Sequence, residues 1–202
     1  FISEIRSMPT YEQKIAVAQE AYENEFLKNY SPNGVIAFIS NTAEMTDYGK
    51  KLFFLNDPKL VSTQNELNSI CKTNASHIDV STLGCFSQRD KTIYLLDNNS
   101  GLANNLLAAT AAHELLHSVY VKLPFKERRQ IDDALMSIWN GSNHKYLKNR
   151  LSAYNFAQST PNLNELHSII GTELGNLPDL LEKHYSKYFN QEKVYNISKS
   201  FN

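Results

Sequence analysis

The most restrictive feature of this chain is the stretch LLAATAAHELLHSVYVKL, residues 106–123, which is apolar and rich in alanine. A helix that is apolar around most of its circumference has to be buried, so this stretch predicts a helix that is buried on several faces. We expect the helix to run from about residue 102 to 122 and to end before Pro124, which cannot continue it. Polar side chains inside such a helix are costly and need a chemical reason to be there.

The segments around this helix predict a single α+β domain, residues 1–202, in which a small, mostly antiparallel sheet is followed by a helical part. The N-terminal region, residues 1–30, carries a helix that begins near Thr10, with Gln13 completing a capping box. The sheet-rich region, residues 34–97, has β-rich or apolar runs at 34–40 and 51–55, a helix at 62–71, and a hairpin with strands at 83–86 and 92–96. The helical region, residues 102–202, adds amphipathic segments at 126–139, 144–156, 161–172 and 179–189.

Composition narrows the classes of partner. Hydrophobic residues make up 42% of the chain, charged residues 20%, and the formal net charge is −1, so we expect no nucleic-acid partner. No apolar run reaches the 18 residues that are needed to span a bilayer, and the first residues lack a targeting pattern. Because the chain starts without Met, an upstream signal peptide or membrane anchor could have been removed from it.

The chain has two cysteines, Cys71 and Cys85, which are too far apart in sequence for a zinc knuckle. They are either two separate thiols or a disulfide that closes a loop of about fifteen residues, and we expect the disulfide. A disulfide would place the protein outside a reducing cytosol, as a secreted, periplasmic or membrane-anchored ectodomain.

The buried helix contains His113, Glu114 and His117, which form an H-E-x-x-H pattern. Positions i and i+4 lie above one another on a helix, so both imidazoles can bind one metal ion, for which we expect Zn²⁺. Glu114 lies about 100° around the helix, where it can reach a metal-bound water as a general base without being a ligand. The alternative is that both histidines are ordinary core or surface residues.

A catalytic zinc site needs a third protein ligand. The elongated pattern that continues with Gly and His is absent, because Tyr120 and Leu123 occupy those positions. The chain instead resembles gluzincin-type zinc metallopeptidases, in which a glutamate on a downstream helix completes the site. HELLH and NELHSIIG are also similar to the ligand segments of clostridial neurotoxin proteases. The resemblance covers only these two segments, implies a zincin-like fold, and makes Glu165 the third ligand.

Other residues compete for that role. Glu165 would also suit the N-terminal turn of a helix that Thr160 caps and Pro161 begins. Glu173 is the alternative ligand, or a carboxylate that supports a metal-bound histidine. His167 and His144 are weaker candidates.

Hydrolysis at zinc also needs a group that stabilises the oxyanion. His184, Tyr185 and Tyr188 are the candidates, although tyrosines at helical spacing are commonly core residues. Arg150 and Tyr120 have less in their favour.

Together these features predict a zinc metallopeptidase acting on a peptide or protein substrate. The strand at 92–96, just before the metal helix, would be the sheet edge that pairs with an extended peptide. One alternative is a catalytically inactive zincin-fold binding or scaffold protein with a structural zinc. Another is a metal-free helical module whose histidines bind a partner.

Overall fold

The computed structural model of the chain describes residues 10–72, 83–97, 103–152 and 161–201. The contacts divide it into two compact units, residues 1–32 and 33–202, each of which is described by itself. In the first unit, helix α2 (Tyr11–Asn29) begins with the expected capping box of Thr10 and Gln13. Among the described residues, no helix combines the length and the apolar character needed to cross a membrane.

The second unit confirms the α+β class, and its described residues are mostly helical. Its helices are α3 (Gly34–Thr42), α4 (Asp47–Leu55), α5 (Gln64–Lys72), α6 (Ala103–Lys122), α7 (Phe125–Trp139), α8 (His144–Ser152), α9 (Leu163–Glu173), α10 (Asp179–Tyr185) and α11 (Gln191–Lys199). Its strands are β1 (Lys59–Val61), β2 (Gly84–Ser87) and β3 (Thr92–Leu96).

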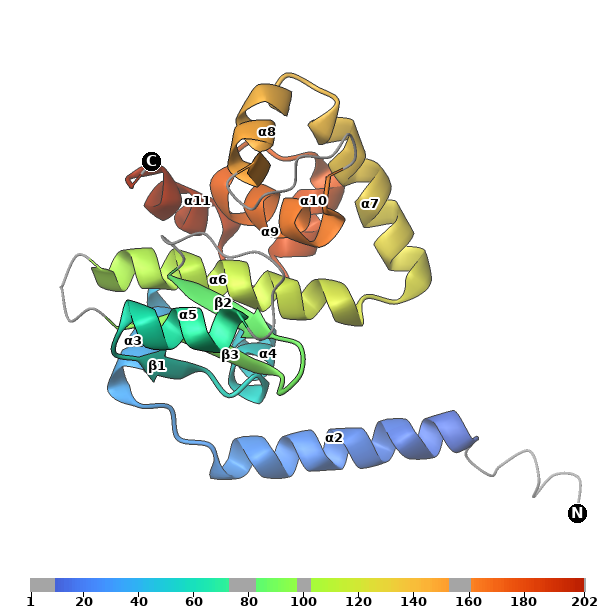
Figure 1. Cartoon of the computed structure of the whole chain (residues 1–202). Coiled ribbons are helices and arrows are strands. Elements are labelled where there is room, and N and C mark those ends of the chain that lie inside the picture. Colours follow the sequence, from blue (N-terminus) through green and yellow to red (C-terminus); the bar gives the residue numbers. More distant parts are fainter. Residues whose placement is uncertain (1–9, 73–82, 98–102, 153–160, 202) are drawn as a thin grey trace, which may run out of the picture. The chain divides into compact units, whose positions relative to one another are not determined.

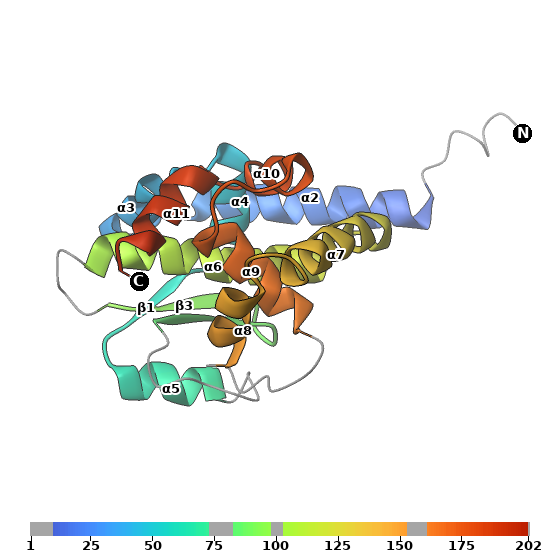
Figure 2. The ribbon, with the colours of Figure 1, turned by 90° about the horizontal axis from the view of Figure 1, so that it is seen from above.

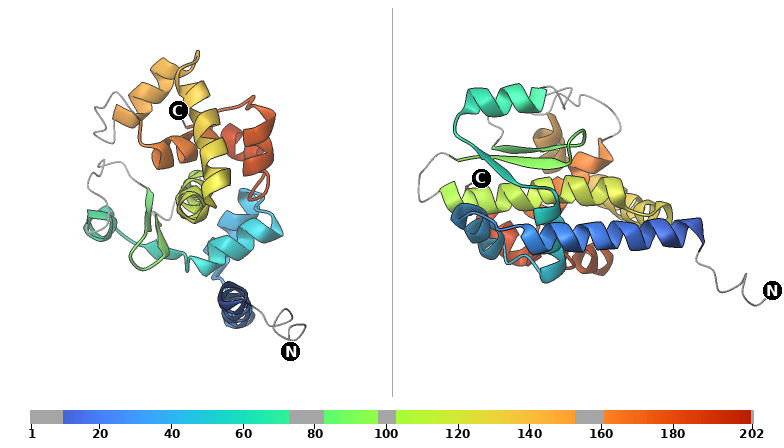
Figure 3. Two further views of the ribbon diagram at one scale, coloured as in Figure 1. Left: turned by 90° about the vertical axis from the view of Figure 1, so that its right-hand side faces the viewer. Right: turned by 90° about the horizontal axis from the view of Figure 1, so that it is seen from below.

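The three strands form one mixed sheet in the order β1-β3-β2, not the mostly antiparallel sheet that we expected. β2 and β3 make the expected antiparallel hairpin, in which Cys85 lies opposite Tyr94, whereas β1 runs parallel to β3. Helix α5 covers one face of the sheet and α6 the other (Figures 2 and 3). β3 is therefore the central strand, and β2 is the strand beside α6 that has no second neighbour among the described residues.

Helix α6 lies at the centre of the main hydrophobic core (Figure 1). Leu115, Leu116, Ala111 and Ala112 are completely buried on its several faces, as its sequence predicts. The side away from the sheet packs against α3, α9 and α11. Since α6 is held on all sides, the direction in which its polar side chains project is fixed by the core.

Two predictions in the sheet-rich region are wrong. Residues 34–40 and 51–55 belong to helices α3 and α4, because each helix has a side-chain cap that the apolar run obscures. Asn33 accepts a hydrogen bond from the backbone N–H of Ile36, and Thr46 accepts one from Gly49. Strand β1 was not expected.

The disulfide between Cys71 and Cys85 is present, with the two Cα atoms 6.1 Å apart. It joins the end of α5 to strand β2 and borders a small second core of Val61, Leu67 and Leu96. The hairpin is thus attached covalently to the layer that covers its outer face.

Candidate metal centre

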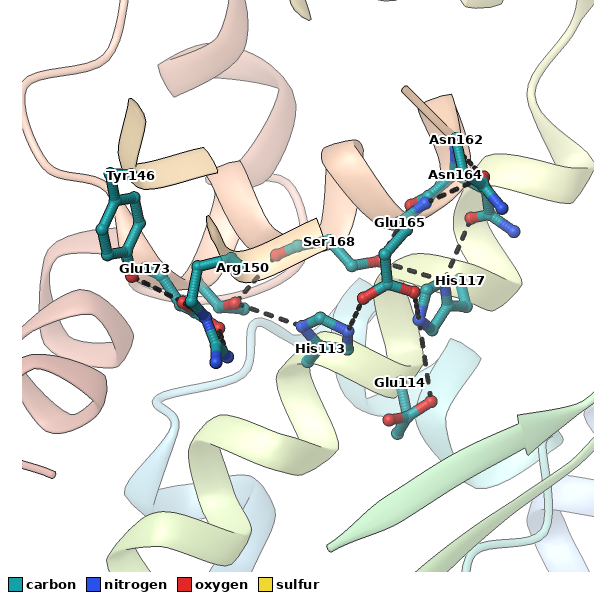
Figure 4. A network of polar contacts seen from close by, with 11 residues as sticks. His113, Glu114, His117, Tyr146, Arg150, Asn162, Asn164, Glu165, Ser168 and Glu173 are labelled. Atoms are coloured by element: carbon teal, nitrogen blue, oxygen red, sulfur yellow. Dashed lines mark hydrogen bonds and ion pairs between the residues drawn. The ribbon is translucent and has the colours of Figure 1, made fainter. Parts of the chain in front are cut away.

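The two histidines of the H-E-x-x-H pattern project from one face of α6, as their spacing predicts. The ring centroids of His113 and His117 are 4.9 Å apart. Their side chains are only 12% and 15% exposed, and both Nε2 atoms point towards helix α9 (Figure 4). Two largely buried imidazoles therefore lie side by side and face the same helix.

Glu165 on α9 lies between them. Its Oε1 lies 3.1 Å from Nε2 of His113, and its Oε2 lies 3.4 Å from Nε2 of His117. The three residues form the one group among the described residues whose ligand atoms all lie within 4.8 Å of one another, so they could hold a metal ion. Ligands about 2.0 Å from a tetrahedral zinc are separated by roughly 3.3 Å, which fits these distances.

The outer nitrogens of both imidazoles face oxygens of α9. Nδ1 of His117 lies 3.1 Å from Oδ1 of Asn164 and 3.2 Å from Oγ of Ser168. Nδ1 of His113 lies 3.5 Å from Oγ1 of Thr172. Both hydroxyl groups already donate to backbone carbonyls of α9, so their oxygens accept from the imidazoles. This arrangement places a proton on each Nδ1 and directs each Nε2 to a metal.

These contacts show that α9 runs past α6 in the opposite direction, since Asn164 lies beside His117 and Thr172 beside His113. The approach is close because residue 171 is glycine: a Cβ there would lie 2.6 Å from Cδ1 of Leu116 and 2.6 Å from Cε1 of Tyr185. The absence of a side chain at Gly171 therefore lets the helix that carries Glu165 reach the histidines.

Glu114 lies beside the group without belonging to it. Its Oε2 is 3.9 Å from Nε2 of His117, and the residue is 6% exposed. Burial raises the pKa of the Glu114 carboxyl group, and the charge of Glu165 raises it further. His117, His113 and a hydrogen bond from the Phe86 amide on β2 lower this pKa, but they do not cancel the effect of burial. A buried carboxylate with a raised pKa, held against the sheet, is suited to exchanging a proton at the site.

Without a metal, Glu165 changes the protonation of His113. Burial alone would lower the pKa of His113, but the hydrogen bond and charge of Glu165, with Glu114 and Glu173 farther away, raise it to about 9. The site is thus built around a positive charge, which a protonated imidazole or a bound cation can supply.

Glu173, the alternative ligand, is committed to other partners. Its Oε1 and Oε2 accept hydrogen bonds of 2.6 Å from Arg150, and Oε2 accepts another of 2.6 Å from the Tyr146 hydroxyl. It lies outside the group of His113, His117 and Glu165 and next to Tyr146 and Arg150 (Figure 4). The oxygen that Nδ1 of His113 contacts is that of Thr172. Glu165 is therefore the carboxylate that the structure brings to the histidines.

The expected oxyanion groups lie elsewhere. Tyr185 is completely buried, and its hydroxyl donates to the backbone carbonyl of His167, so it is not available to a substrate. His184 is 2% exposed and lies 2.9 Å from His167 through their Nε2 atoms. Tyr188 is 4% exposed and packs against the ring of His184. The structure brings none of the three to the metal-binding group.

The remaining candidates are structural as well. Nδ1 of His144 contacts the backbone carbonyl of Trp139, and the Tyr120 hydroxyl donates to Asp132. The ligand helix begins at Leu163, where Asn162 is the cap, while Thr160 lies outside the described residues.

Sequence reasoning missed Asn164, Ser168 and Thr172. They recur every four residues on α9, so a polar stripe beside Glu165 was a signal that could have found them. It also missed Phe86, whose contribution is a backbone amide and leaves no trace in residue type.

No protein-family model, curated protein or solved structure matches the chain. Its function has to be argued from the side-chain geometry.

Proposed function

We propose that the chain is a zinc-dependent peptidase with a zincin-like fold and a gluzincin-type ligand set. The observation that carries this proposal is the convergence of three ligand atoms, from His113, His117 and Glu165, with a second acidic side chain, Glu114, placed beside them. Three protein ligands leave a position for solvent or substrate, which is typical of catalytic zinc and untypical of structural zinc.

When bound, zinc would act as a Lewis acid that activates water and polarises the scissile carbonyl. The work of the protein is proton transfer by Glu114. Its carboxylate removes a proton as the water oxygen adds to the carbonyl carbon, and it delivers that proton to the leaving amine nitrogen as the C–N bond breaks. The Phe86 amide keeps this carboxylate in place.

Strand β2 is the sheet edge on which we place an extended peptide. The strand at 92–96, which the sequence favours for this role, is β3, and β3 is central and already pairs on both sides. β2 carries Phe86 and packs against α6, so a peptide added along its outer edge would run beside Glu114. A protein or peptide substrate follows from this mode of binding.

The disulfide supports an extracytoplasmic location, because such bonds persist in oxidising compartments. We propose that the protein acts there on peptides or proteins.

The substitution Glu114→Gln tests the function. The full chain should contain one zinc, measured by elemental analysis, and should cleave an unfolded protein, with products identified by mass spectrometry. The variant should retain zinc and lose about 10²–10⁴-fold in rate, since only the general base is removed. Glu192→Gln, on an exposed position of α11, is the matched control and should keep full activity.

Cleavage that persists in a clean preparation of the Glu114→Gln variant would exclude this role. A zinc that shows four protein ligands in X-ray absorption spectra would favour the alternative of an inactive binding protein with a structural metal.

A further inference from the structure

A second polar site lies on the opposite side of α9, between the start of α7 and helix α10. These two helices pack together (Figure 1). They border a pocket with a volume of about 420 Å³. Its lining residues are Pro124, Lys126, Glu127, Gln130, Ile131, Leu180, Lys183, His184 and Lys187. None of them belongs to the metal centre.

The charge of the pocket is positive, with three lysines against one glutamate. Glu127 is paired with Lys187, whose Nζ is 2.9 Å from its Oε1. Lys126 and Lys183 are exposed and have no acidic partner among the described residues. The pocket therefore has two lysines, Lys126 and Lys183, whose charge is not balanced by an acidic partner among the described residues. The formal net charge of the whole chain is −1.

The start of α7 adds to this positive character. Pro124 stands at the cap position and makes no side-chain cap, and the first internal hydrogen bond is donated by Arg128. The backbone N–H groups of the first turn of this 15-residue helix therefore have no acceptor from its cap. Such groups favour a negatively charged ligand.

A buried imidazole faces the pocket without a hydrogen bond. Nδ1 of His184 has no hydrogen-bond partner, although the residue is only 2% exposed, and the nearest acidic atom is Oε1 of Glu127 at 3.7 Å. The other ring nitrogen is used in the contact with His167. Buried polar atoms in folded proteins almost always have partners, and 3.7 Å is too long for a hydrogen bond to Glu127, so this nitrogen remains able to bond a ligand in the pocket.

Part of the lining is apolar. Pro124, Ile131 and Leu180 contribute to it, and Leu180 is 46% exposed. Phe125, next to the pocket in sequence, is 82% exposed. A ligand therefore needs an apolar part as well as a negative charge.

We propose that this pocket binds a peptide segment in which an acidic side chain stands next to an apolar one. The carboxylate would lie between Lys126, Lys183 and the His184 imidazole, and the apolar side chain would lie on Leu180. A metal ion is disfavoured by the three lysines. A lipid surface is disfavoured because the buried His184 lies at the wall of a concave pocket.

We identify this peptide segment as a part of the substrate that lies at a distance from the scissile bond. This identification rests on the proposed peptidase function. His184 of the pocket contacts His167 on α9, two positions from Glu165, so one lining residue touches the helix that carries Glu165.

The test uses the full chain carrying Glu114→Gln, which prevents turnover. The probe is a fluorescein-labelled octapeptide of alternating Glu and Leu, and the readout is fluorescence anisotropy. Reversal of both rim charges, by Lys126→Glu and Lys183→Glu, should weaken binding about tenfold. The matched control Lys193→Glu, on an exposed position of α11, should change the affinity less than about twofold.

A second probe, in which Gln replaces every Glu, should bind at least about tenfold more weakly than the acidic probe. Equal binding of the two probes, or an unchanged affinity in the doubly reversed variant, would overturn the proposal. So would capture of phosphatidylserine vesicles through the same two lysines by a protein that does not bind the acidic probe. Because the readout needs no hydrolysis, failure of the peptidase proposal would leave this result intact.

Discussion

The described part of the chain contains two pairs of histidines that are largely or fully buried, and they differ in one respect. The rings of His113 and His117 are 4.9 Å apart and those of His167 and His184 are 5.1 Å apart, both in edge-on arrangements. The first pair has Glu165 between its Nε2 atoms, whereas the Nε2 atoms of the second pair contact each other.

The pKa values diverge accordingly. Glu165 overcomes the effect of burial and raises the pKa of His113 to about 9. Burial, with the charge of Lys187, lowers the pKa of His184 to about 4, and Glu127 opposes this only in part. One carboxylate thus separates a site that attracts a cation from a pair that stays neutral.

The substitution that should change this difference between the two histidine pairs most is Glu165→Gln, which keeps the shape of the side chain and removes its charge. Zinc affinity should fall on the order of 1000-fold, because a ligand is lost, as measured by competition with a chelating dye. The control Glu173→Gln should lose less than about tenfold, since Glu173 bonds Arg150 and Tyr146. Equal losses in the two variants would contradict the assignment of Glu165.

The pH dependence of stability should separate the two pairs in the metal-free protein. His113 has a folded-state pKa above its ordinary 6.5, so its stabilisation is complete below pH 6.5 and is lost as the pH rises through 9. His184 has a folded-state pKa below 6.5, so its stabilisation is complete above pH 6.5 and is lost as the pH falls through 4.

Urea unfolding at pH 4, 6.5 and 9.5 should show a fall on the order of 1–3 kcal/mol on each side. Saturating zinc should remove the alkaline fall. The variant His113→Gln should lack the alkaline fall and keep the acidic one, and an alkaline fall that persists in it would contradict this interpretation.

Gly171 lies between the two pairs of histidines, since its neighbours are Leu116 on α6 and Tyr185 on α10. Gly171→Ala inserts a methyl group where 2.6 Å is available, so the free energy of unfolding should fall by about 1–3 kcal/mol. Zinc affinity should fall as well, because α9 has to move. A stable variant with normal zinc affinity would show that α6 and α9 can move apart without disturbing either pair of histidines.

The smallest expected effect comes from Thr172→Val, which removes the oxygen behind His113 and keeps the volume. Because that contact is 3.5 Å long, zinc affinity should fall by about tenfold or less. Ser168→Ala, at 3.2 Å from His117, should have the larger effect of the two. The reverse order would show that hydrogen-bond length does not determine how these oxygens support the ligands.

Helix α6 and the shared face of its two histidines could be predicted because the information is local. The four-residue spacing places His113 and His117 on one face, and the apolar flanks of the pattern require burial. The choice between Glu165 and Glu173 could not be made in this way. It depends on Arg150 and Tyr146 of α8, which bind Glu173 only after the helices have packed.

The errors in the first third of the second unit have a related cause. Residues 34–40 and 51–55 are short apolar runs, and length and periodicity do not distinguish a buried strand from a buried helix over so few residues. The decisive signals were the caps Asn33 and Thr46. Strand β1 has only three residues and exists because β3 is available to pair with it.

The bond between Cys71 and Cys85 links the chemical environment of the protein to its candidate general base. Cys85 immediately precedes Phe86, whose amide holds the Glu114 carboxylate. Opening the bridge with a reductant would leave that amide dependent on the pairing of two short strands. The oxidation state of Cys71 and Cys85 would therefore affect the position of the neighbouring Phe86 amide, and with it the Glu114 carboxylate that would exchange a proton.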